Sequence, residues 1–231
     1  MRYVLPILLI LGACADFTSH RYIGADYLGA HYVKNPLGEG IAPDSDLQIR
    51  FDAFDCTTFV ETALADGDVK KLNKIRYANG IPNILSRNHF VETDWIKNNS
   101  DIVRDVTENY GKTRTRSVTI DKKKWFKSKY NLDVNIAPQT VKLQYIPYDN
   151  MPEINVDKPM IVLFIADTGK IRDKIGTDLA VRHMGFILPN GMLRHASYRH
   201  GQVMDIDFSK YVTQIMENKN NLGIMLLEII K

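Results

Sequence analysis

The sequence contains very little cysteine and no strongly one-sided charge. Its 231 residues include two cysteines, and the first, Cys14, ends an N-terminal apolar run. The second, Cys56, has no disulfide partner in the body of the chain, which excludes a disulfide-stabilised scaffold. The Cys-x-x-Cys and His-Glu-x-x-His spacings that are typical of zinc sites are also missing. The formal net charge of +3 is too small to indicate a partnership with nucleic acid.

Long hydrophobic runs are absent after residue 15, and the one at the N-terminus is short. Arg2 followed by the apolar run Val4 to Leu11 is typical of an export signal and is too short to span a bilayer as a mature helix. The run Leu11-Gly12-Ala13-Cys14 resembles a lipoprotein box, in which Cys14 would be lipidated. A cut at the small residues that flank Cys14 remains the alternative. We therefore expect residues 1–15 to be a signal peptide, and we favour the lipoprotein form over simple secretion.

Residues 16–231 are sufficient for a single domain with one sizeable core. The 45% hydrophobic and 25% charged composition is ordinary for a globular protein. Helical patterns come first and strand patterns follow, which predicts an α+β fold with a mostly antiparallel sheet. We expect helices over 56–65, from 68 onward and over 209–217, a long polar and aromatic loop region over 76–107, and strands over 118–120, 141–148, 160–166, 182–188, 192–197, 203–206 and 224–230.

Cys56 lies at a position where its thiol can be reactive. It follows Asp55, a residue type that caps helices, and precedes an apolar helical pattern that ends at Asp66-Gly67. The sulfur is therefore predicted at a helix N-terminus, where the helix dipole favours the thiolate.

Two histidines flank a short turn in the C-terminal half. Pro189-Asn190-Gly191 between His183 and His195 has the chemistry of a three-residue hairpin loop. If Leu188 pairs with Met192, the two imidazoles lie on the same face as diagonal neighbours, within reach of a ring-to-ring hydrogen bond. A two-residue turn would shift the register by one and place them on opposite faces.

Gly185 would lie opposite His195 in this register, and its missing side chain leaves room for the two rings. The alternative is that one histidine belongs to the core and the other is solvated. Together with Cys56, however, the same-face pair supplies a nucleophile, a base and a residue that orients the base. These are the three roles that covalent acyl transfer requires.

The chain resembles the N-acetylmuramoyl-L-alanine amidase-like family, within the NlpC-type branch of the papain-like cysteine hydrolases. These are bacterial enzymes that cut amide or peptide bonds in peptidoglycan. The resemblance runs from about Tyr27 to the C-terminus and rests on an ordered set of motifs: Phe54-Asp55-Cys56-Thr57-Thr58-Phe59-Val60-Glu61, Ile75-Arg76-Tyr77, Ser86-Arg87-Asn88-His89-Phe90, Asp94-Trp95, Asp105-Val106-Thr107, His183-Met184-Gly185 and His195-Ala196-Ser197.

The resemblance implies a papain-like fold in which the helix bearing Cys56 packs on the sheet bearing the histidines, with a long inserted substrate-groove region. It implies that Cys56 is the nucleophile, His183 the general base and acid, and His195 the orienting residue. Tyr32 is similar to an active-site tyrosine of the superfamily, although His31 stands where a proline is usual. No cofactor is implied.

The implied reaction is hydrolysis of the bond between N-acetylmuramic acid and L-alanine in a bacterial, periplasmic cell-envelope protein. Five residues are candidates for binding the muropeptide. Asp55 either only caps the helix or also holds a substrate amide, and Arg87 and His89 suit the carboxylates of an acidic peptide. Trp95 and Tyr77 either line the groove beneath a sugar or pack in the core.

Three alternatives remain open at this point. Cys56, His183, His195 and His89 could supply four zinc ligands. The protein could be a lipoprotein that binds peptidoglycan or another envelope component without catalysis. It could also be an endopeptidase of the same superfamily that cuts inside the stem peptide.

Overall fold

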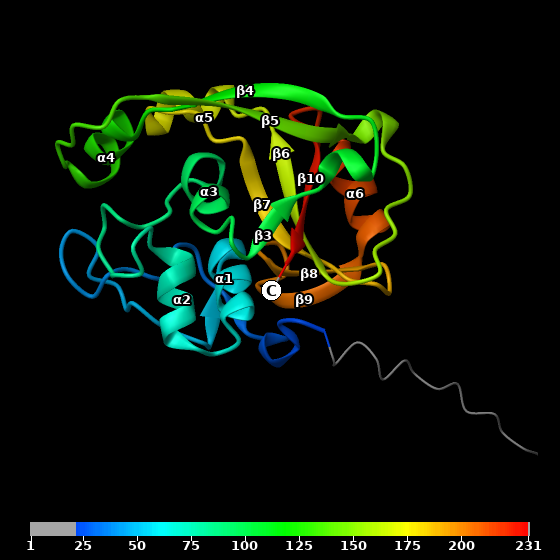
Figure 1. Ribbon diagram of the computed structural model, residues 1–231, viewed down its shortest axis with the longest axis horizontal. Coiled ribbons are helices and arrows are strands. Elements are labelled where there is room, and N and C mark those ends of the chain that lie inside the picture. The colour runs from blue at the N-terminus through cyan, green and yellow to red at the C-terminus, as the bar shows by residue number, and fades with distance from the viewer. Residues whose placement is uncertain (1–21, 231) are drawn as a thin grey trace, which may run out of the picture.

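The computed structural model describes residues 22–230. The expected signal peptide and Cys14 lie outside this range, so export and lipidation stay predictions. The described chain forms a ten-stranded sheet in the order β2-β1-β9-β8-β7-β6-β10-β5-β4, with β3 also paired to β10 (Figure 1). The strands are β1 (His31–Tyr32), β2 (Ala53–Phe54), β3 (Val103–Asp105), β4 (Arg114–Ile120), β5 (Gln139–Pro147), β6 (Met160–Ala166), β7 (Val181–Ile187), β8 (Met192–Ser197), β9 (Gln202–Asp207) and β10 (Asn221–Ile229).

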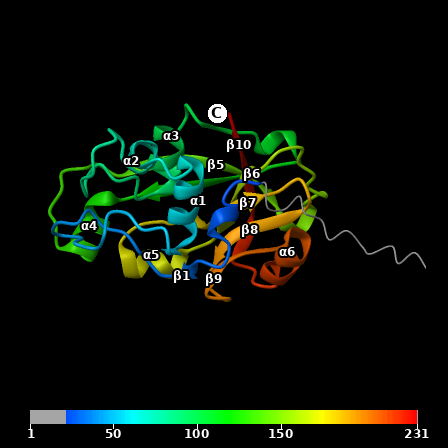
Figure 2. The same cartoon turned by 90° about the horizontal axis from the view of Figure 1, so that it is seen from below.

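Helices cover both faces of this sheet. They are α1 (Cys56–Ala65), α2 (Val69–Arg76), α3 (Ile96–Asn98), α4 (Lys122–Tyr130), α5 (Gly169–Ile175) and α6 (Phe208–Met216), with a π-helical turn over Val91–Trp95 and 3-10 turns over Ala25–Tyr27, Thr107–Asn109 and Tyr148–Asn150. Figures 1 and 2 show α1 and α6 on opposite sides of the strands. The helix that begins at Cys56 and the C-terminal helix α6 therefore enclose the histidine hairpin from two sides.

The sequence of the central strand β6 is continuously apolar and does not alternate with polar residues. Ile161 and Leu163 belong to the core on the α1 side, whereas Val162 and Phe164 belong to the core on the α6 side. A strand that is buried on both faces has no solvent-facing position to fill with polar residues. The same two cores sandwich the strands that carry the candidate site.

The predicted α+β order and mostly antiparallel sheet are confirmed. Helix α1 ends at Ala65, and its C-cap Asp66 adopts the left-handed conformation expected at a helix end. The expected helix from residue 68 onward is α2, in which Leu72 and Ile75 are buried and the first residue, Val69, is exposed. The sequence pattern did not predict α5 or the short strands β1, β2 and β3, which contain too few residues to show a period.

The hairpin register is the one that brings the histidines to one face. The Leu188 amide donates a hydrogen bond to the Met192 carbonyl at 2.9 Å, and Phe186 pairs with Arg194. The strands pass very close at Gly185, where an added Cβ would lie 2.9 Å from the Cβ of His195. The three-residue loop and the role predicted for Gly185 are both confirmed.

The substitution Gly185→Ala should therefore disturb the hairpin. The new methyl would also lie 2.7 Å from the Arg194 carbonyl oxygen, which is backbone and cannot turn away. We expect the free energy of unfolding to fall by about 1–3 kcal/mol, the usual effect of overpacking, together with a loss of activity. Urea denaturation tests this against Gly169→Ala, where no heavy atom lies closer than 3.9 Å to the added Cβ. Equal stabilities of the two variants would contradict the tight contact.

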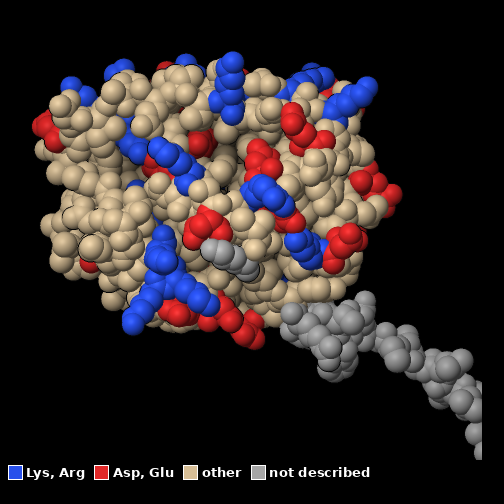
Figure 3. Space-filling model, in the orientation of Figure 1, with Lys and Arg blue, Asp and Glu red and all other residues tan. Residues whose placement is uncertain are grey.

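Charges of both signs are interspersed on the molecular face that Figure 3 shows. On the face in Figure 3, Lys and Arg side chains form separate small groups next to Asp and Glu rather than one continuous basic area. Within residues 22–230, no helix is both long enough and apolar enough to cross a bilayer.

Candidate active site

Cys56 is the first residue of α1, and the N-cap fixes it there. The Asp55 side chain accepts a hydrogen bond from the Thr58 amide at 2.8 Å, and the Thr58 hydroxyl accepts one from the Asp55 amide at 2.9 Å. This reciprocal capping box satisfies two backbone donors at the start of the helix. It holds the thiol at the positive end of the helix dipole, as the sequence predicts.

Burial opposes the dipole at this sulfur. Cys56 is free and retains partial access to solvent, but the surrounding protein raises the pKa of its thiol to about 12, with the Asp55 carboxylate as a secondary cause. Hydrogen bonds from the backbone of Met184 and from Thr57 act in the opposite direction. The resting group is therefore a neutral thiol rather than the thiolate that its helix position alone suggests, because desolvation outweighs the dipole.

The two histidines form a hydrogen-bonded pair. His183 Nε2 lies 2.7 Å from His195 Nδ1, and the ring centroids are 4.9 Å apart. Burial lowers the pKa of His183 to about 3, with the neighbouring His195 as the second cause, and burial lowers the pKa of His195 to about 4. Both rings are therefore neutral near pH 7, the state in which an imidazole can accept a proton.

A glutamate of the π-helical turn over Val91–Trp95 holds the start of β7 in place. Glu92 Oε1 accepts hydrogen bonds from the amides of Ala180 and Val181, at 2.7 and 2.8 Å. Both amides precede His183 by only a few residues. A buried carboxylate thus orders the backbone that leads to the histidine, and π-helical turns are often found at functional sites.

The strand β7 also connects the histidines to the thiol. Met184, whose backbone is near enough to the Cys56 sulfur to lower the pKa of the thiol, directly follows His183 in the chain. Helix α1 packs on β7 and β8 through its apolar side chains, including the edge-to-face pair Phe59 and Phe186 with centroids 5.7 Å apart. The helix start and the histidine hairpin therefore meet at one place in the fold.

Two tyrosines lie near the point where the start of α1 meets the histidine hairpin. Tyr32 lies in β1, which pairs in parallel with β2 so that Tyr32 is opposite Phe54. Burial raises the pKa of Tyr32 to about 12, and the neighbouring Cys56 and Asp55 add to the effect. Tyr32 is thus placed near the thiol with a hydroxyl that stays protonated at neutral pH.

Tyr211 of α6 is a residue that the sequence did not single out. Its ring lies 5.1 Å from the ring of His195 and 6.1 Å from that of His183, between centroids. Burial raises the pKa of Tyr211 to about 12, again with Cys56 as the second cause. In the sequence it belongs to the apolar stripe of an amphipathic helix, so nothing distinguished it from an ordinary core residue.

A groove of about 480 Å³ begins beside the thiol. Asp55 and Thr57, the chain neighbours of Cys56, form part of its wall. Its other lining residues come from the loop between β1 and β2, from α1, α2, α4 and α5, from the 87–90 segment, and from β7 and the residues just before it: Lys34, Asn35, Pro36, Leu37, Thr58, Glu61, Arg76, Arg87, Asn88, His89, Phe90, Trp125, Lys129, Ile171, Ile175, Leu179 and Arg182. A separate cavity of about 580 Å³ between α2 and α3 contains none of the catalytic candidates.

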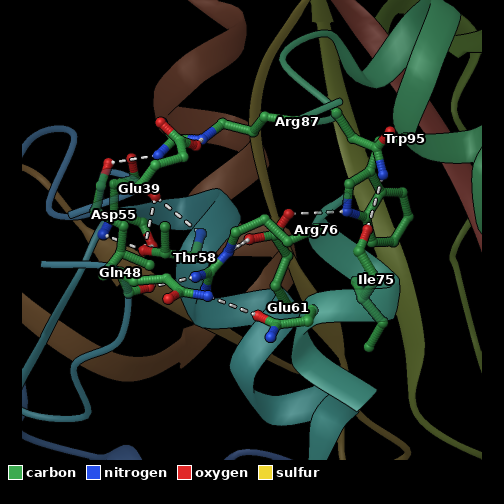
Figure 4. Close-up of polar contacts among 12 residues, drawn as sticks. Glu39, Gln48, Asp55, Thr58, Glu61, Ile75, Arg76, Arg87 and Trp95 are labelled. Atoms are coloured by element: carbon green, nitrogen blue, oxygen red, sulfur yellow. Dashed lines mark hydrogen bonds and ion pairs between the residues drawn. The ribbon is translucent and has the colours of Figure 1, made fainter. Parts of the chain in front are cut away.

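Arg87 and His89 border the groove, but both side chains are already engaged. Arg87 Nε forms an ion pair with Glu39 at 2.6 Å, and its Nη1 lies 3.3 Å from Asp44 (Figure 4). His89 Nε2 hydrogen-bonds to the Ile84 carbonyl at 2.7 Å, and burial lowers the pKa of His89 to about 3. These contacts hold the loops that form the groove and leave neither side chain as a free cation.

Tyr77 and Trp95 are in the core and not in the groove wall. Both are 0% exposed. The Trp95 indole donates to Glu61 Oε1 at 3.2 Å, and Glu61 Oε2 pairs with Arg76 at 3.1 Å (Figure 4). The sequence left open whether these two aromatic residues line the groove or pack in the core, and the structure places both in the core. For Trp95, the buried carboxylate of Glu61 supplies a hydrogen-bond partner for the indole there.

The buried Glu61–Arg76 pair should be important for stability. Glu61→Ala leaves the guanidinium of Arg76 buried without its carboxylate, which typically costs about 3–5 kcal/mol. We expect this loss in the free energy of unfolding measured with urea. The matched control is Asp133→Ala, which removes the partner of Lys127 from an exposed pair and should change stability far less. A loss no larger than the control's would contradict a structural role for the buried pair.

The residues proposed as zinc ligands do not form a metal site in residues 22–230. His89 packs against Trp125, with ring centroids 4.7 Å apart, and not against the histidine pair. In this part of the chain no group of three or more His, Cys, Asp or Glu side chains is arranged to hold a metal ion.

The fold and the site define an α+β protein with a helix-start thiol and a histidine pair on an antiparallel sheet. A family model described as AmiA-like, N-acetylmuramoyl-L-alanine amidase-like, matches residues 22–220. The chain therefore belongs to the N-acetylmuramoyl-L-alanine amidase-like family.

Solved structures share this fold. A protein from Legionella pneumophila is 23% identical with a TM-score of 0.79, over 90% of this chain and 87% of that one. An N-acetylmuramoyl-L-alanine amidase from Bacteroides uniformis is 24% identical with a TM-score of 0.70, over 90% of this chain and 96% of that one. No curated protein sequence matches the chain.

Proposed function

We propose that the protein is a cysteine amidase that hydrolyses the bond between N-acetylmuramic acid and L-alanine in muropeptides. The observation that carries this proposal is the 2.7 Å bond between His183 and His195, on a strand against which the helix that begins at Cys56 packs through Phe59 and Phe186. Membership of the amidase-like family supports the choice of bond. The thiol supplies a nucleophile and the pair supplies its base.

The hydrogen bond between the rings supports a division of roles between the two histidines. We place the proton of the pair on His183 Nε2, which donates to His195 Nδ1. His183 Nδ1 is then unprotonated and can act as a base towards the thiol. His195 is a neutral acceptor that orients the His183 ring and stabilises the imidazolium that forms when His183 takes a proton.

The reaction then proceeds in two steps. The sulfur of Cys56 attacks the lactyl carbonyl carbon while its proton moves to His183, and the C–N bond breaks as His183 returns that proton to the departing L-alanine nitrogen. This leaves a thioester between Cys56 and the sugar, and a free peptide. Water, deprotonated by His183, attacks the thioester and releases the sugar carboxylate and the thiol.

The helix start supplies donors for the oxyanion. Asp55 caps the Thr58 amide, and the first intrahelical bond runs from the Phe59 amide to the Asp55 carbonyl at 3.0 Å. The amide of Cys56 precedes both and has no helical carbonyl to bind. With the protonated Tyr32 hydroxyl, it would stabilise the negative charge that develops on the carbonyl oxygen.

Digestion of a defined muropeptide followed by mass spectrometry tests the proposal. The expected products are free sugar and the intact stem peptide. A truncated peptide still attached to the sugar would instead identify a stem-peptide endopeptidase. Binding without any product would identify a non-catalytic envelope protein.

A further inference from the structure

The groove beside Cys56 has more cationic side chains than it has carboxylates to pair with them. Asp55 and Glu61 are its acidic lining residues, and both are engaged, in the helix cap and with Arg76 respectively. Arg87 is neutralised by Glu39 and Asp44 outside the groove. Three further lining cations form no ion pair with any residue of the 22–230 range: Lys34, Lys129 and Arg182.

Lys129 is held over the groove by aromatic rings. Its Nζ lies 5.2 Å from the centroid of Trp125 and 4.9 Å from that of Tyr130. The side chain stays exposed to solvent, and the surrounding protein lowers the pKa of Lys129. An ammonium that is positioned by aromatic rings and has no carboxylate partner is available to pair with an incoming anion.

Arg182 brings a second free cation close to the reacting atoms. It precedes His183 in β7 and lines the same groove as Lys129. Its guanidinium can bind a carboxylate through two parallel hydrogen bonds. Because Asp55 and Thr57, the chain neighbours of Cys56, line the same groove, a substrate held at the thiol can extend into it.

We propose that Lys129 and Arg182 form a binding site for a carboxylate of the stem peptide, with Lys34 at its margin. This inference rests on the proposed function for the identity of the ligand, and it assigns recognition to these cations rather than to Arg87. The site selects peptides with free carboxylates over peptides whose carboxylates are amidated.

Binding to a hydrolytically inert variant tests the site separately from the reaction. In the Cys56→Ala background, calorimetry would compare a defined muropeptide with free stem-peptide carboxylates and the same compound with carboxamides. We expect Lys129→Gln and Arg182→Gln each to weaken binding of the free acid by roughly tenfold, the scale of one charge-assisted hydrogen bond, and to leave binding of the carboxamide unchanged.

The control is Lys127→Gln, on the same helix as Lys129 but paired with Asp133 at 2.8 Å and not among the groove residues. It should bind both compounds like the parent. Unchanged affinity of the two groove variants for the free acid would overturn the proposal. Equal losses on both compounds would also overturn it, because they would indicate a structural effect. A wild type that binds the free acid selectively but cuts neither compound would contradict the proposed reaction and leave the carboxylate site supported.

Discussion

Cys56→Ala should lower kcat for muropeptide hydrolysis by at least about 10⁴-fold, because no other group of the site can form the covalent bond to the carbonyl carbon. Cys56 is the free cysteine of residues 22–230, and its sulfur lies at the capped start of α1. The measurement is the rate of release of stem peptide from a defined muropeptide, followed by chromatography.

The fold should survive this substitution. The capping bonds at the start of α1 join Asp55 and Thr58 and do not involve the Cys56 side chain. The urea midpoint of Cys56→Ala should therefore stay near that of the parent. A variant that folds and still hydrolyses at a rate within tenfold of the wild type would show that Cys56 is not the nucleophile.

His183→Gln should lower kcat/KM by about 10³-fold or more, since the variant loses the group that takes the thiol proton and returns it to the leaving nitrogen. The thiol of Cys56 has a pKa raised to about 12, so at neutral pH it depends on this base for ionisation. His200→Gln is the matched control, because His200 lies in the turn after β8 and its Nδ1 lies 3.0 Å from the Ser197 hydroxyl. Its activity should remain close to that of the wild type.

The same base sets the pH dependence of the wild type. The active form of His183 is the neutral ring, and burial lowers its pKa to about 3, with that of His195 lowered to about 4. Activity is therefore retained as the pH falls through about 6.5, the ordinary value for imidazole, and is lost only at lower pH. An acid limb of kcat/KM at or above pH 6.5 would contradict neutral, desolvated histidines.

The parts of the site that follow from local chemistry could be predicted from the sequence. The Asp55 cap, the end of α1 at Asp66 and the hairpin register each depend on a few adjacent residues with strong conformational preferences. The register in turn determined that His183 and His195 share a face. The central strands were also predictable, because a strand buried on both faces must be continuously apolar.

The rest depends on partners that are distant in the sequence. Arg87 pairs with Asp44, 43 positions away, so its sequence context could not show that its charge is already neutralised. Trp95 is likewise drawn into the core by Glu61, 34 positions away. Lys129 belongs to a lysine-rich helix that reads as a solvated surface. Only the packing of α4 beside the groove makes Lys129 a binding candidate. In the same way, only the placement of α6 brings Tyr211 next to His195.

Trapping with hydroxylamine tests the covalent mechanism most directly. Hydroxylamine competes with water for the thioester on Cys56, so wild-type digests of a defined muropeptide should contain the hydroxamate of the sugar's lactyl group together with an intact stem peptide. Mass spectrometry distinguishes this product from the free carboxylate. A digest that yields only the sugar carboxylate at high hydroxylamine concentration, or a hydroxamate on a peptide fragment, would contradict attack by Cys56 on the amide between sugar and L-alanine.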